Sequence, residues 1–280
     1  GGIFNSIKQD MRGIQVAGVG NHVNENVVGT QVGGIFNVAR GKAEGVQASG
    51  IFNYAKKATA IQAAGIFNIA DDCFSGLQVA PIMNSAGPGM GVQVSGLMNI
   101  NHGGIKTQVS GLMNIAGDVD YAQISPVMNI AKKVKGFQFG LINVADTVSG
   151  VPIGLLNLVR KGYNRVEIFA GESLVANAGL KLGARSFYNI FQIGARWDNE
   201  ITMDLNGNEN KGNVLTWGFG YGFGTAFKLN KKSLLNIELV GMHINEREEW
   251  TDELNLLGQL RFLVDMRLGR RTSIFVGPTG

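Results

Sequence analysis

The chain has 280 residues, enough for one large domain or two ordinary ones with a sizeable core. It contains 41 glycines, five prolines and only 16% charged residues, a composition that is unusual for a soluble enzyme and favours closely packed β structure. The net charge of +4 comes from basic residues that stand singly or in pairs between apolar runs, so we expect no nucleic acid partner.

The single cysteine, Cys73, provides neither a disulfide framework nor a cysteine-based metal site. No run of about 18 apolar residues occurs, so we expect no transmembrane helix. Only a β-barrel could then carry this chain across a membrane.

From the N-terminus to residue 160 the chain repeats one phrase, Gly-Val-Gln-Val-Ser-Gly-Leu-Met-Asn-Ile-Ala, every 14 to 16 residues. Charges are almost confined to the connectors between copies, such as KKAT and KKVK. Inside the phrases, Val, Ile and Phe alternate with small residues, and a glycine about every five residues disfavours a helix. We therefore predict that each phrase forms strand and that each connector forms a turn.

Two amide residues mark the register of the repeat, with the glutamine six residues before the asparagine, or five in one late copy. We predict that their side chains form a structural ladder. The asparagines are Asn5, Asn21, Asn37, Asn53, Asn68, Asn84, Asn99, Asn114, Asn129, Asn143 and Asn157, and the glutamines are Gln15, Gln31, Gln47, Gln62, Gln78, Gln93, Gln108, Gln123 and Gln138.

Two architectures fit this unit. In a parallel β-solenoid each copy is one coil, so identical positions stack about 4.8 Å apart and amide ladders can form. In an antiparallel barrel each copy is one membrane strand of about 9 to 11 residues. We favour the solenoid because Pro81 and Pro126 replace the central glycine of the phrase, and because later copies lose a residue near that point. A corner tolerates such changes, whereas a straight strand would turn the side chains that follow, including Asn143, to the opposite face.

We expect each coil to have three short sides of about five residues. Val, Leu and small residues would fill its narrow interior. A boundary follows near residues 160–163, where the phrase stops and longer alternating strands begin.

Beyond this boundary we count about seven strands, near residues 164–171, 173–184, 186–197, 214–228, 233–245, 254–268 and from 272 onward. In residues 254–268, Arg261 and Asp265 belong to a polar face that is interrupted by Leu257 and Leu263. In residues 217–227, aromatic residues oppose glycine and alanine. Fifteen residues tilted by about 45° cover the hydrocarbon core of a bilayer, and such strands are long for a soluble sheet.

A closed bacterial barrel has an even number of strands, so we expect that Gly280 cuts the last strand short. Two hydrophilic segments, DNEITMDLNGNENKGN and NEREEWTDE, are predicted to be loops at strand ends.

The predicted fold is therefore all-β. A parallel β-solenoid of 14–16-residue repeats occupies residues 1–160, and antiparallel strands of the outer-membrane β-barrel type occupy residues 161–280. The alternative is one continuous antiparallel β-barrel of about 18 strands.

The repeated phrase, its later copy GFQFGLINVA and the passage VPIGLLNLVRKGYNRVEI carry a family resemblance, together with ARSFYNIFQIGARW, WGFGYGFGTAFKLNKK and LNLLGQLRF. They resemble the surface-repeat outer membrane proteins of Bacteroidota-type bacteria, which are related to repeats in spirochaete surface proteins. The resemblance covers essentially the whole chain. It implies a location in the outer membrane or at the cell surface, and it implies no enzyme and carries over no catalytic residue.

The motifs that could have a chemical function are better explained by ordinary structural roles. GFGYGFG continues an aromatic alternation with no helix signal after it, which is untypical of a dinucleotide loop. DLNGNEN has Asp204 and Asn206 at the spacing of a calcium loop, but Glu209 and Leu215 stand where a glycine and an acid are needed. His22, His102 and His243 lack a matching ligand set, and the acidic residues near 246–253 are those of a charged loop.

One further row is formed by Phe36, Phe52 and Phe67 with Met83, Met98, Met113 and Met128, for which we favour core packing or contact with the barrel over docking. We thus assign no catalytic, cofactor-binding or metal-binding residue.

We expect a non-enzymatic bacterial outer membrane or surface protein that serves as a scaffold, adhesion or signalling component. Its partners would be outer membrane lipid and other envelope proteins, with no cofactor. The alternative is an outer membrane pore or transport barrel with a lumen lined by Gln and Asn. An enzyme acting on surface polysaccharide is disfavoured because no acid pair recurs in a plausible cleft.

Overall fold

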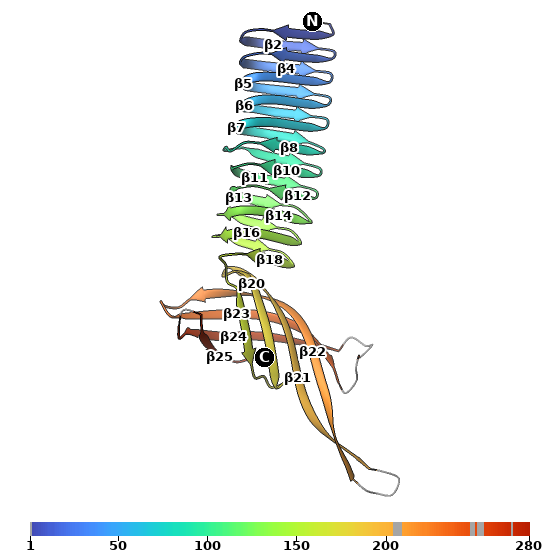
Figure 1. The fold of residues 1–280 in the computed structure, drawn as a ribbon, viewed down its shortest axis with the longest axis vertical. Coiled ribbons are helices and arrows are strands. Elements are labelled where there is room, and N and C mark those ends of the chain that lie inside the picture. The colour runs from blue at the N-terminus through green and yellow to red at the C-terminus, as the bar shows by residue number, and fades with distance from the viewer. Residues whose placement is uncertain (1, 204–208, 247–249, 251–254, 270) are drawn as a thin grey trace. The chain divides into compact units, whose positions relative to one another are not determined.

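The structure is a computed structural model that describes residues 2–203, 209–246, 250, 255–269 and 271–280, with the backbone alone for 200–203 and 209–211. All regular elements in these ranges are β-strands, which confirms the all-β prediction (Figure 1). No helix in the described ranges is long and apolar enough to span a membrane. The chain divides into two compact units, Gly1–Arg160 and Lys161–Gly280.

Residues 2–160 form one sheet system of 18 strands, and all of its strand pairs are parallel. The strands are β1 (Phe4–Ile7), β2 (Met11–Ala17), β3 (Gly20–Val23), β4 (Val27–Gly33), β5 (Phe36–Ser49), β6 (Phe52–Ala64), β7 (Phe67–Ala80), β8 (Met83–Ala86), β9 (Val92–Ser95), β10 (Met98–Asn101), β11 (Gly104–Ser110), β12 (Met113–Ile115), β13 (Asp118–Ile124), β14 (Met128–Val134), β15 (Phe137–Phe139), β16 (Ile142–Val148), β17 (Val151–Ile153) and β18 (Leu156–Val159).

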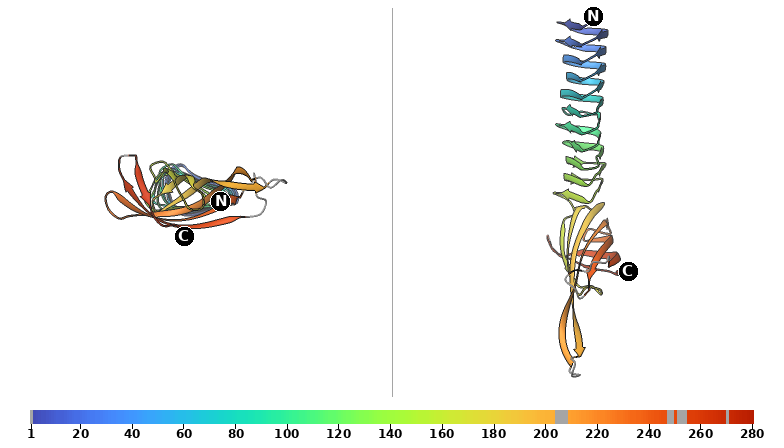
Figure 2. Two further views of the ribbon diagram at one scale, coloured as in Figure 1. Left: turned by 90° about the horizontal axis from the view of Figure 1, so that it is seen from below. Right: turned by 90° about the vertical axis from the view of Figure 1, so that its right-hand side faces the viewer.

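Each strand pairs with the same part of the next copy. Asn5 pairs with Asn21 in the asparagine column, and Gln15 pairs with Gln31 in the glutamine column. The long strands β5, β6 and β7 run through both columns, with a register shift at the charged connector. Parallel neighbours one repeat apart confirm the β-solenoid, whose stacked coils are visible in Figure 2. The alternative of one continuous antiparallel barrel is wrong, because an antiparallel barrel cannot contain these parallel pairs.

In each copy, the segment that contains the glutamine is called the glutamine strand, and the segment that contains the asparagine is called the asparagine strand. The chain bends between these two segments, at the centre of the phrase. A β-carbon on Gly34 would lie 1.9 Å from the carbonyl oxygen of Gly18 one coil earlier, so the backbones of successive coils are in contact there. Pro81 and Pro126 occupy this bend as exposed residues between strands. A second distortion lies two residues before the glutamine, within β5, where Gly45 has a φ of +116° that favours glycine.

The interior of the solenoid differs from the prediction in one respect. Small residues do line it, and its apolar part contains Val23, Ala39 and Ala43 among others. Valines that flank a glutamine, such as Val32 and Val79, and leucines at the bend, such as Leu97, instead face outward. The reason is strand alternation: a glutamine that points inward places both of its neighbours on the outer surface.

The second unit is a seven-stranded antiparallel sheet in chain order. Its strands are β19 (Arg165–Phe169), β20 (Ala176–Ala184), β21 (Phe187–Met203), β22 (Glu209–Lys228), β23 (Ser233–Asn245), β24 (Leu256–Arg267) and β25 (Ser273–Val276). The sheet curves into a half-barrel, since the rings of Phe169 on β19 and Phe275 on β25 lie 5.7 Å apart.

The strand count of about seven agrees with the sequence, but one hairpin is longer than predicted. Residues 198–203 and 209–213 were expected to belong to a loop, yet Asp198 pairs with Val214 and Asn199 with Asn213. The apolar alternation stops before these residues, while the backbone ladder continues because pairing needs no apolar side chain.

Candidate functional site

The asparagine side chains of the solenoid form one continuous hydrogen-bonded row. Each Nδ2 donates to the Oδ1 of the asparagine in the following copy at 2.8 to 3.0 Å, from Asn5 through to Asn157. The same Nδ2 also donates to a backbone carbonyl oxygen, that of the residue directly after the next glutamine in the sequence. Asn99, for example, donates to Val109, which follows Gln108, at 2.7 Å. Each asparagine therefore joins two coils through both side chain and backbone.

The glutamines form a second row that runs in the opposite direction. Each Nε2 donates to the Oε1 of the glutamine in the preceding copy at 2.8 to 2.9 Å, from Gln138 back to Gln15. Several also donate to a carbonyl of the asparagine strand, such as Gln108 to Ile115 at 3.1 Å. Aligned amides have aligned dipoles, so the dipoles of the two rows oppose each other.

The glutamine row ends at a proline. Gln138 pairs with Pro152 of the next copy, which has no side-chain amide to donate. The buried Oε1 of Gln138 consequently has no hydrogen-bond partner among the described residues. This proline stops the row while the asparagine row continues for one more step to Asn157.

The charged residues of the solenoid lie along its connector edge. Some neighbouring connectors bear opposite charges, and three ion pairs join copies there: Lys133 with Asp118 at 4.0 Å, Lys135 with Asp120 at 2.8 Å, and Arg160 with Asp146 at 2.8 Å. The Asp120 carboxylate raises the pKa of Lys135, chiefly through their hydrogen bond.

Tyr54 belongs to the same edge. Its hydroxyl donates to Asp71 Oδ2 at 2.6 Å, and this hydrogen bond is the main reason that the pKa of Tyr54 is raised to about 12. The connector edge thus joins neighbouring coils through ion pairs and this hydrogen bond.

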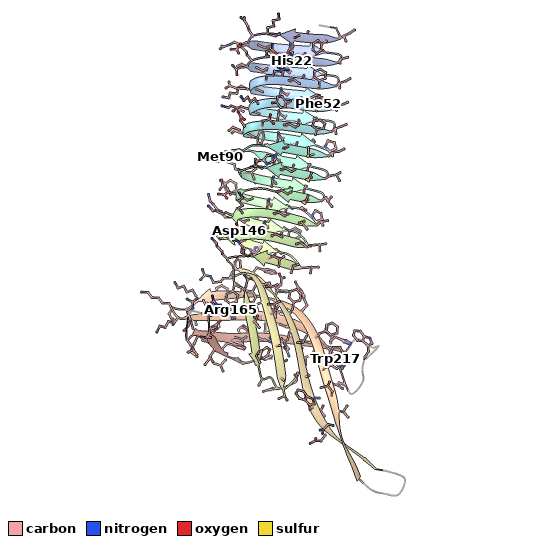
Figure 3. The ribbon with its side chains drawn as sticks, in the orientation of Figure 1. His22, Phe52, Met90, Asp146, Arg165 and Trp217 are labelled. Carbon is pink, nitrogen blue, oxygen red and sulfur yellow. The ribbon has the colours of Figure 1, made fainter. Side chains whose placement is uncertain are left out.

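The row of Phe36, Phe52 and Phe67 lies on the outside, half-buried, with successive rings stacked at 5.5 and 5.3 Å. Met83, Met98, Met113 and Met128 continue it, also half-buried. Figure 3 shows Phe52 near the edge of the coils opposite Asp146. The phenylalanine rings pack on one another across coils. The predicted core packing is wrong, since each of the seven side chains neighbours an inward asparagine and lies outside the interior.

The outward face of the half-barrel is largely apolar, and its inner face combines charged residues with an apolar cluster that includes Tyr188, Ile190 and Val240. On β19, Val166 and Ile168 are 79% and 84% exposed, whereas Glu167 between them is 8% exposed. The same alternation continues across the sheet, and the outward apolar residues include Leu180, Phe191, Ile193, Trp197, Leu215, Phe219, Phe223, Phe227, Leu239, Leu256, Leu260, Phe262, Met266, Ile274 and Val276. A water-soluble antiparallel sheet usually presents polar residues on its solvated face, so the apolar outward face of this sheet is unusual.

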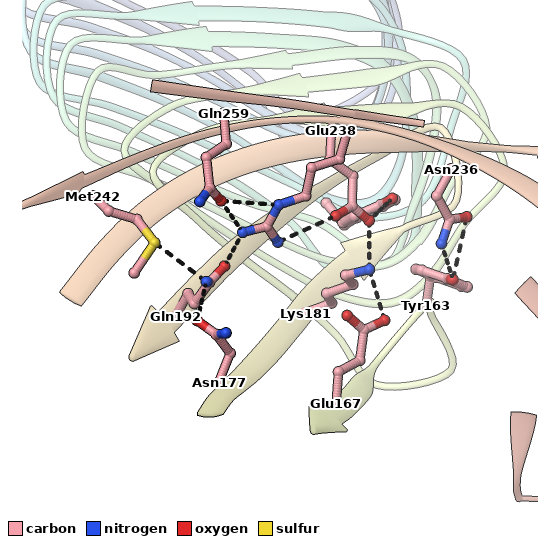
Figure 4. Close-up of polar contacts among 11 residues, drawn as sticks. Tyr163, Glu167, Asn177, Lys181, Gln192, Asn236, Glu238, Met242 and Gln259 are labelled. Atoms are coloured by element: carbon pink, nitrogen blue, oxygen red, sulfur yellow. Dashed lines mark hydrogen bonds and ion pairs between the residues drawn. The ribbon is translucent and has the colours of Figure 1, made fainter. Parts of the chain in front are cut away.

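A charged network occupies the inner face of the half-barrel (Figure 4). Lys181 Nζ contacts Glu167 Oε1 at 2.6 Å and also Glu238 Oε1. Glu238 accepts a hydrogen bond from the Tyr188 hydroxyl at 2.8 Å, and its Oε2 lies 4.0 Å from Arg261. Two acids and two bases from four strands therefore neutralise one another away from water.

Neighbouring side chains complete this network. Arg261 donates to Gln192 and Gln259, and Gln192 donates to Asn177 at 3.0 Å. The Tyr163 hydroxyl donates to Asp265 at 3.3 Å and accepts from Asn236 at 3.0 Å.

The glycines of β22 make room for the inner side chains. A β-carbon on Gly224 would lie 2.8 Å from the Tyr188 ring, and one on Gly222 would lie 2.8 Å from Val240. The run GFGYGFG is therefore the tightly packed centre of a strand, with its aromatic residues turned outward.

The sequence singled out Arg261 and Asp265 as part of a polar face, and both are buried on the inner face. It missed Glu167, Lys181 and Glu238. A usable signal was present: each of these stands alone between apolar neighbours, in RVEIF, GLKLG and NIELV. A single charge within an alternating strand marks the side opposite the apolar residues.

The other candidate residues are not brought together. Within the described ranges, no group of three or more His, Cys, Asp and Glu side chains is arranged to hold a metal ion. His22 and His102 lie in different coils of the first unit, and His243 lies on β23 of the second. Cys73 is exposed. The proposed calcium-loop residues 204–208 and much of the acidic segment 246–253 lie outside the described residues.

The fold and these surfaces define an all-β protein that combines a parallel repeat solenoid with an antiparallel half-barrel. No protein-family model matches the sequence, and comparisons with curated proteins and with solved structures found no match. The function therefore has to be argued from the geometry of the chain itself.

Proposed function

We propose that this protein is a non-enzymatic scaffold of the bacterial outer membrane. In this proposal the half-barrel contacts lipid through its outward face, and the solenoid provides a surface for envelope partners. The observation that carries the proposal is the apolar outward face of β19–β25, which lies opposite a buried charged network on the inner face.

The length of the strands supports lipid contact. β23 has 13 residues and β24 has 12, while a tilted membrane strand needs about 9 to 11. The apolar residues form a patch across several strands, and a patch larger than a few hundred Å² is uncommon on a soluble monomer. A bilayer removes this patch from water without requiring a protein partner for each residue.

The inner network supports the same reading. A buried ion pair costs more in desolvation than it returns unless it is well paired, and here Lys181 contacts two carboxylates while Arg261 donates to two amides. An inward ionic cluster is typical of membrane barrels, whose interior is polar. It would be an unusual choice for the core of a soluble sheet.

The alternative function, a pore, was based on the expectation that Gln and Asn line a lumen. These side chains fill the interior of a solenoid and donate to one another. They line no lumen, so the scaffold is the better supported function.

The test is the location of the full chain in bacteria that express it. We expect recovery with the outer membrane and release only by detergent. Trp197 on β21 is 63% exposed and serves as the probe in a variant whose other two tryptophans are replaced by Phe. In liposomes with brominated acyl chains, we expect the fluorescence of Trp197 to be quenched. Recovery in the soluble periplasmic fraction without detergent, together with unquenched Trp197 fluorescence, would overturn the proposal.

A further inference from the structure

The outer surface of the glutamine strands is an uncharged face that continues through ten coils, from Gln15 to Pro152. In each coil, one residue precedes and one follows the stacked glutamine, or Pro152 in the last coil. These flanking residues point outward, apart from the buried Ala122. None of them is Asp, Glu, Lys or Arg. The exposed members include Val16, Val32, Ile61, Val79, Phe139 and Ile153.

This face is large enough for a specific protein contact. Nine steps of about 4.8 Å along the stack and about 13 Å across a four-residue strand give roughly 560 Å² per copy. Two such faces in contact bury roughly 1,100 Å², which passes the roughly 1,000 Å² expected of a specific interface. Left in water, the face would be a continuous apolar patch of the kind that marks an interaction site.

The charge distribution favours a second copy of this chain as the occupant. Two copies of this face can be in contact without bringing like charges together, because the face has no ionised groups. Two copies of the connector edge could not make such a contact, because that edge is charged. The rows of both copies have the same spacing, so the ridges of one face fit the grooves of the other, as in packed sheets about 10 Å apart. A lipid surface is less well matched, because the outward residues at each level of this face include no Lys or Arg that could hold it against anionic headgroups.

We propose that two copies of the chain associate through the uncharged outer face of their glutamine strands, forming a two-fold symmetric dimer. This inference concerns the solenoid alone and does not depend on membrane insertion of the half-barrel. In a two-fold contact the central coils of the two copies meet, which places Val79 near its own counterpart.

The experiment uses the full chain in detergent micelles and measures its mass by sedimentation. We expect wild type to be a dimer. Val79→Lys and Val79→Glu should each raise the dimer dissociation constant at least about tenfold, because they oppose like charges in an apolar contact. An equal mixture of the two variants should dimerise again. Thr59→Lys, at an exposed connector position of the neighbouring coil, is the matched control and should dimerise as wild type does.

Circular dichroism spectra that match wild type establish that each variant is folded, and the recovery in the mixture makes the same point independently. A monomeric wild-type chain, open polymers in place of dimers, or unchanged association of both Val79 variants would each overturn the proposal. Quenching of a Val79→Trp variant by brominated lipid, in a monomeric chain, would overturn it as well and would identify the bilayer as the occupant.

Discussion

A buried asparagine in this protein satisfies its own amide and that of its neighbours. Asn99 accepts from Asn84 at 3.0 Å and donates to Asn114 at 3.0 Å and to the Val109 carbonyl at 2.7 Å. Burying an amide is costly without such bonds, so each member of the row depends on the two beside it. The repeat can therefore exclude charge and still keep polar side chains inside.

Replacement of Asn99 by Leu should destabilise the solenoid by about 3 kcal/mol, since it leaves amide groups of Asn84 and Asn114 without their partner. The measurement is the urea midpoint of unfolding, followed by a β-sheet signal. The exposed His102, three residues away, provides the control as His102→Ala. Equal midpoints for the two variants would contradict the structural role of the row.

Tyr54 should introduce a pH dependence of stability at alkaline pH. Its pKa is raised to about 12 by the hydrogen bond to Asp71, from an ordinary value of about 10. The folded state holds the proton more tightly, so the stabilisation is complete below about pH 10 and is lost as the pH rises toward 12. The difference in absorbance titration between wild type and Tyr54→Phe isolates this group, and Asp71→Asn should return its pKa toward 10.

The C-terminal coils of the solenoid place opposite charges beside each other from one coil to the next. Equivalent connector residues stack about 4.8 Å apart, where a run of like charges would repel. Placing Asp118 and Asp120 beside Lys133 and Lys135 avoids this. In the half-barrel, alternation acts along each strand instead, so that Glu167 faces inward between two outward apolar residues.

The inner network should be sensitive to loss of its central cation. Replacement of Lys181 by Met leaves Glu167 and Glu238 facing each other without compensation, which should cost about 3–5 kcal/mol. Thermal unfolding of the full chain in micelles measures the change. The double variant Lys181→Met with Glu167→Gln removes one of the two charges and should recover part of the loss. A neutral effect of Lys181→Met would refute the importance of the network.

If the half-barrel contacts lipid, the free-energy cost of an arginine at an outward position of β24 should depend on the depth of that position in the bilayer. Phe262→Arg, in the middle of the strand, should cost about 2–4 kcal/mol, whereas an arginine near a membrane interface costs about 0–1 kcal/mol. Leu268→Arg, just beyond the strand end, is the matched comparison. Folding equilibria in lipid vesicles provide the measurement, and equal costs at both positions would contradict lipid contact.

At the scale of the whole molecule, the solenoid was predictable because each repeat position meets the same surroundings in every coil. Gln93 pairs with Gln78, and Gln108 with Gln93, so the period in the sequence is the period in space. The half-barrel network has no such period. Glu167 reaches Lys181 from the directly paired strand β19, whereas Glu238 lies on the non-adjacent strand β23 and is brought to Lys181 by the curvature of the sheet.

One misassignment also has a physical cause. The usual rule places apolar side chains inside, and it predicted that valine and leucine would fill the coils. The amide rows reverse it locally, because hydrogen bonds along the stack allow Gln and Asn to lie inside while the flanking Val and Leu remain outside.

The two units should differ in their need for an amphiphile. We expect a fragment of residues 161–280 to refold only with detergent or lipid, and a fragment of residues 1–160 to refold in buffer as β structure. Circular dichroism and sedimentation in both media make the comparison. A soluble, folded 161–280 fragment would speak against the membrane assignment of the half-barrel.

The opposed directions of the Asn and Gln rows have a consequence for how such a chain evolves. Because the field of one row offsets that of the other, adding a coil does not build up a growing polarity from end to end. Tandem duplication or loss of a fifteen-residue stretch then changes the reach of the solenoid while every remaining coil keeps its environment. Length can drift by unequal recombination at little energetic penalty, and a lineage can adjust how far the array extends without redesigning any single turn.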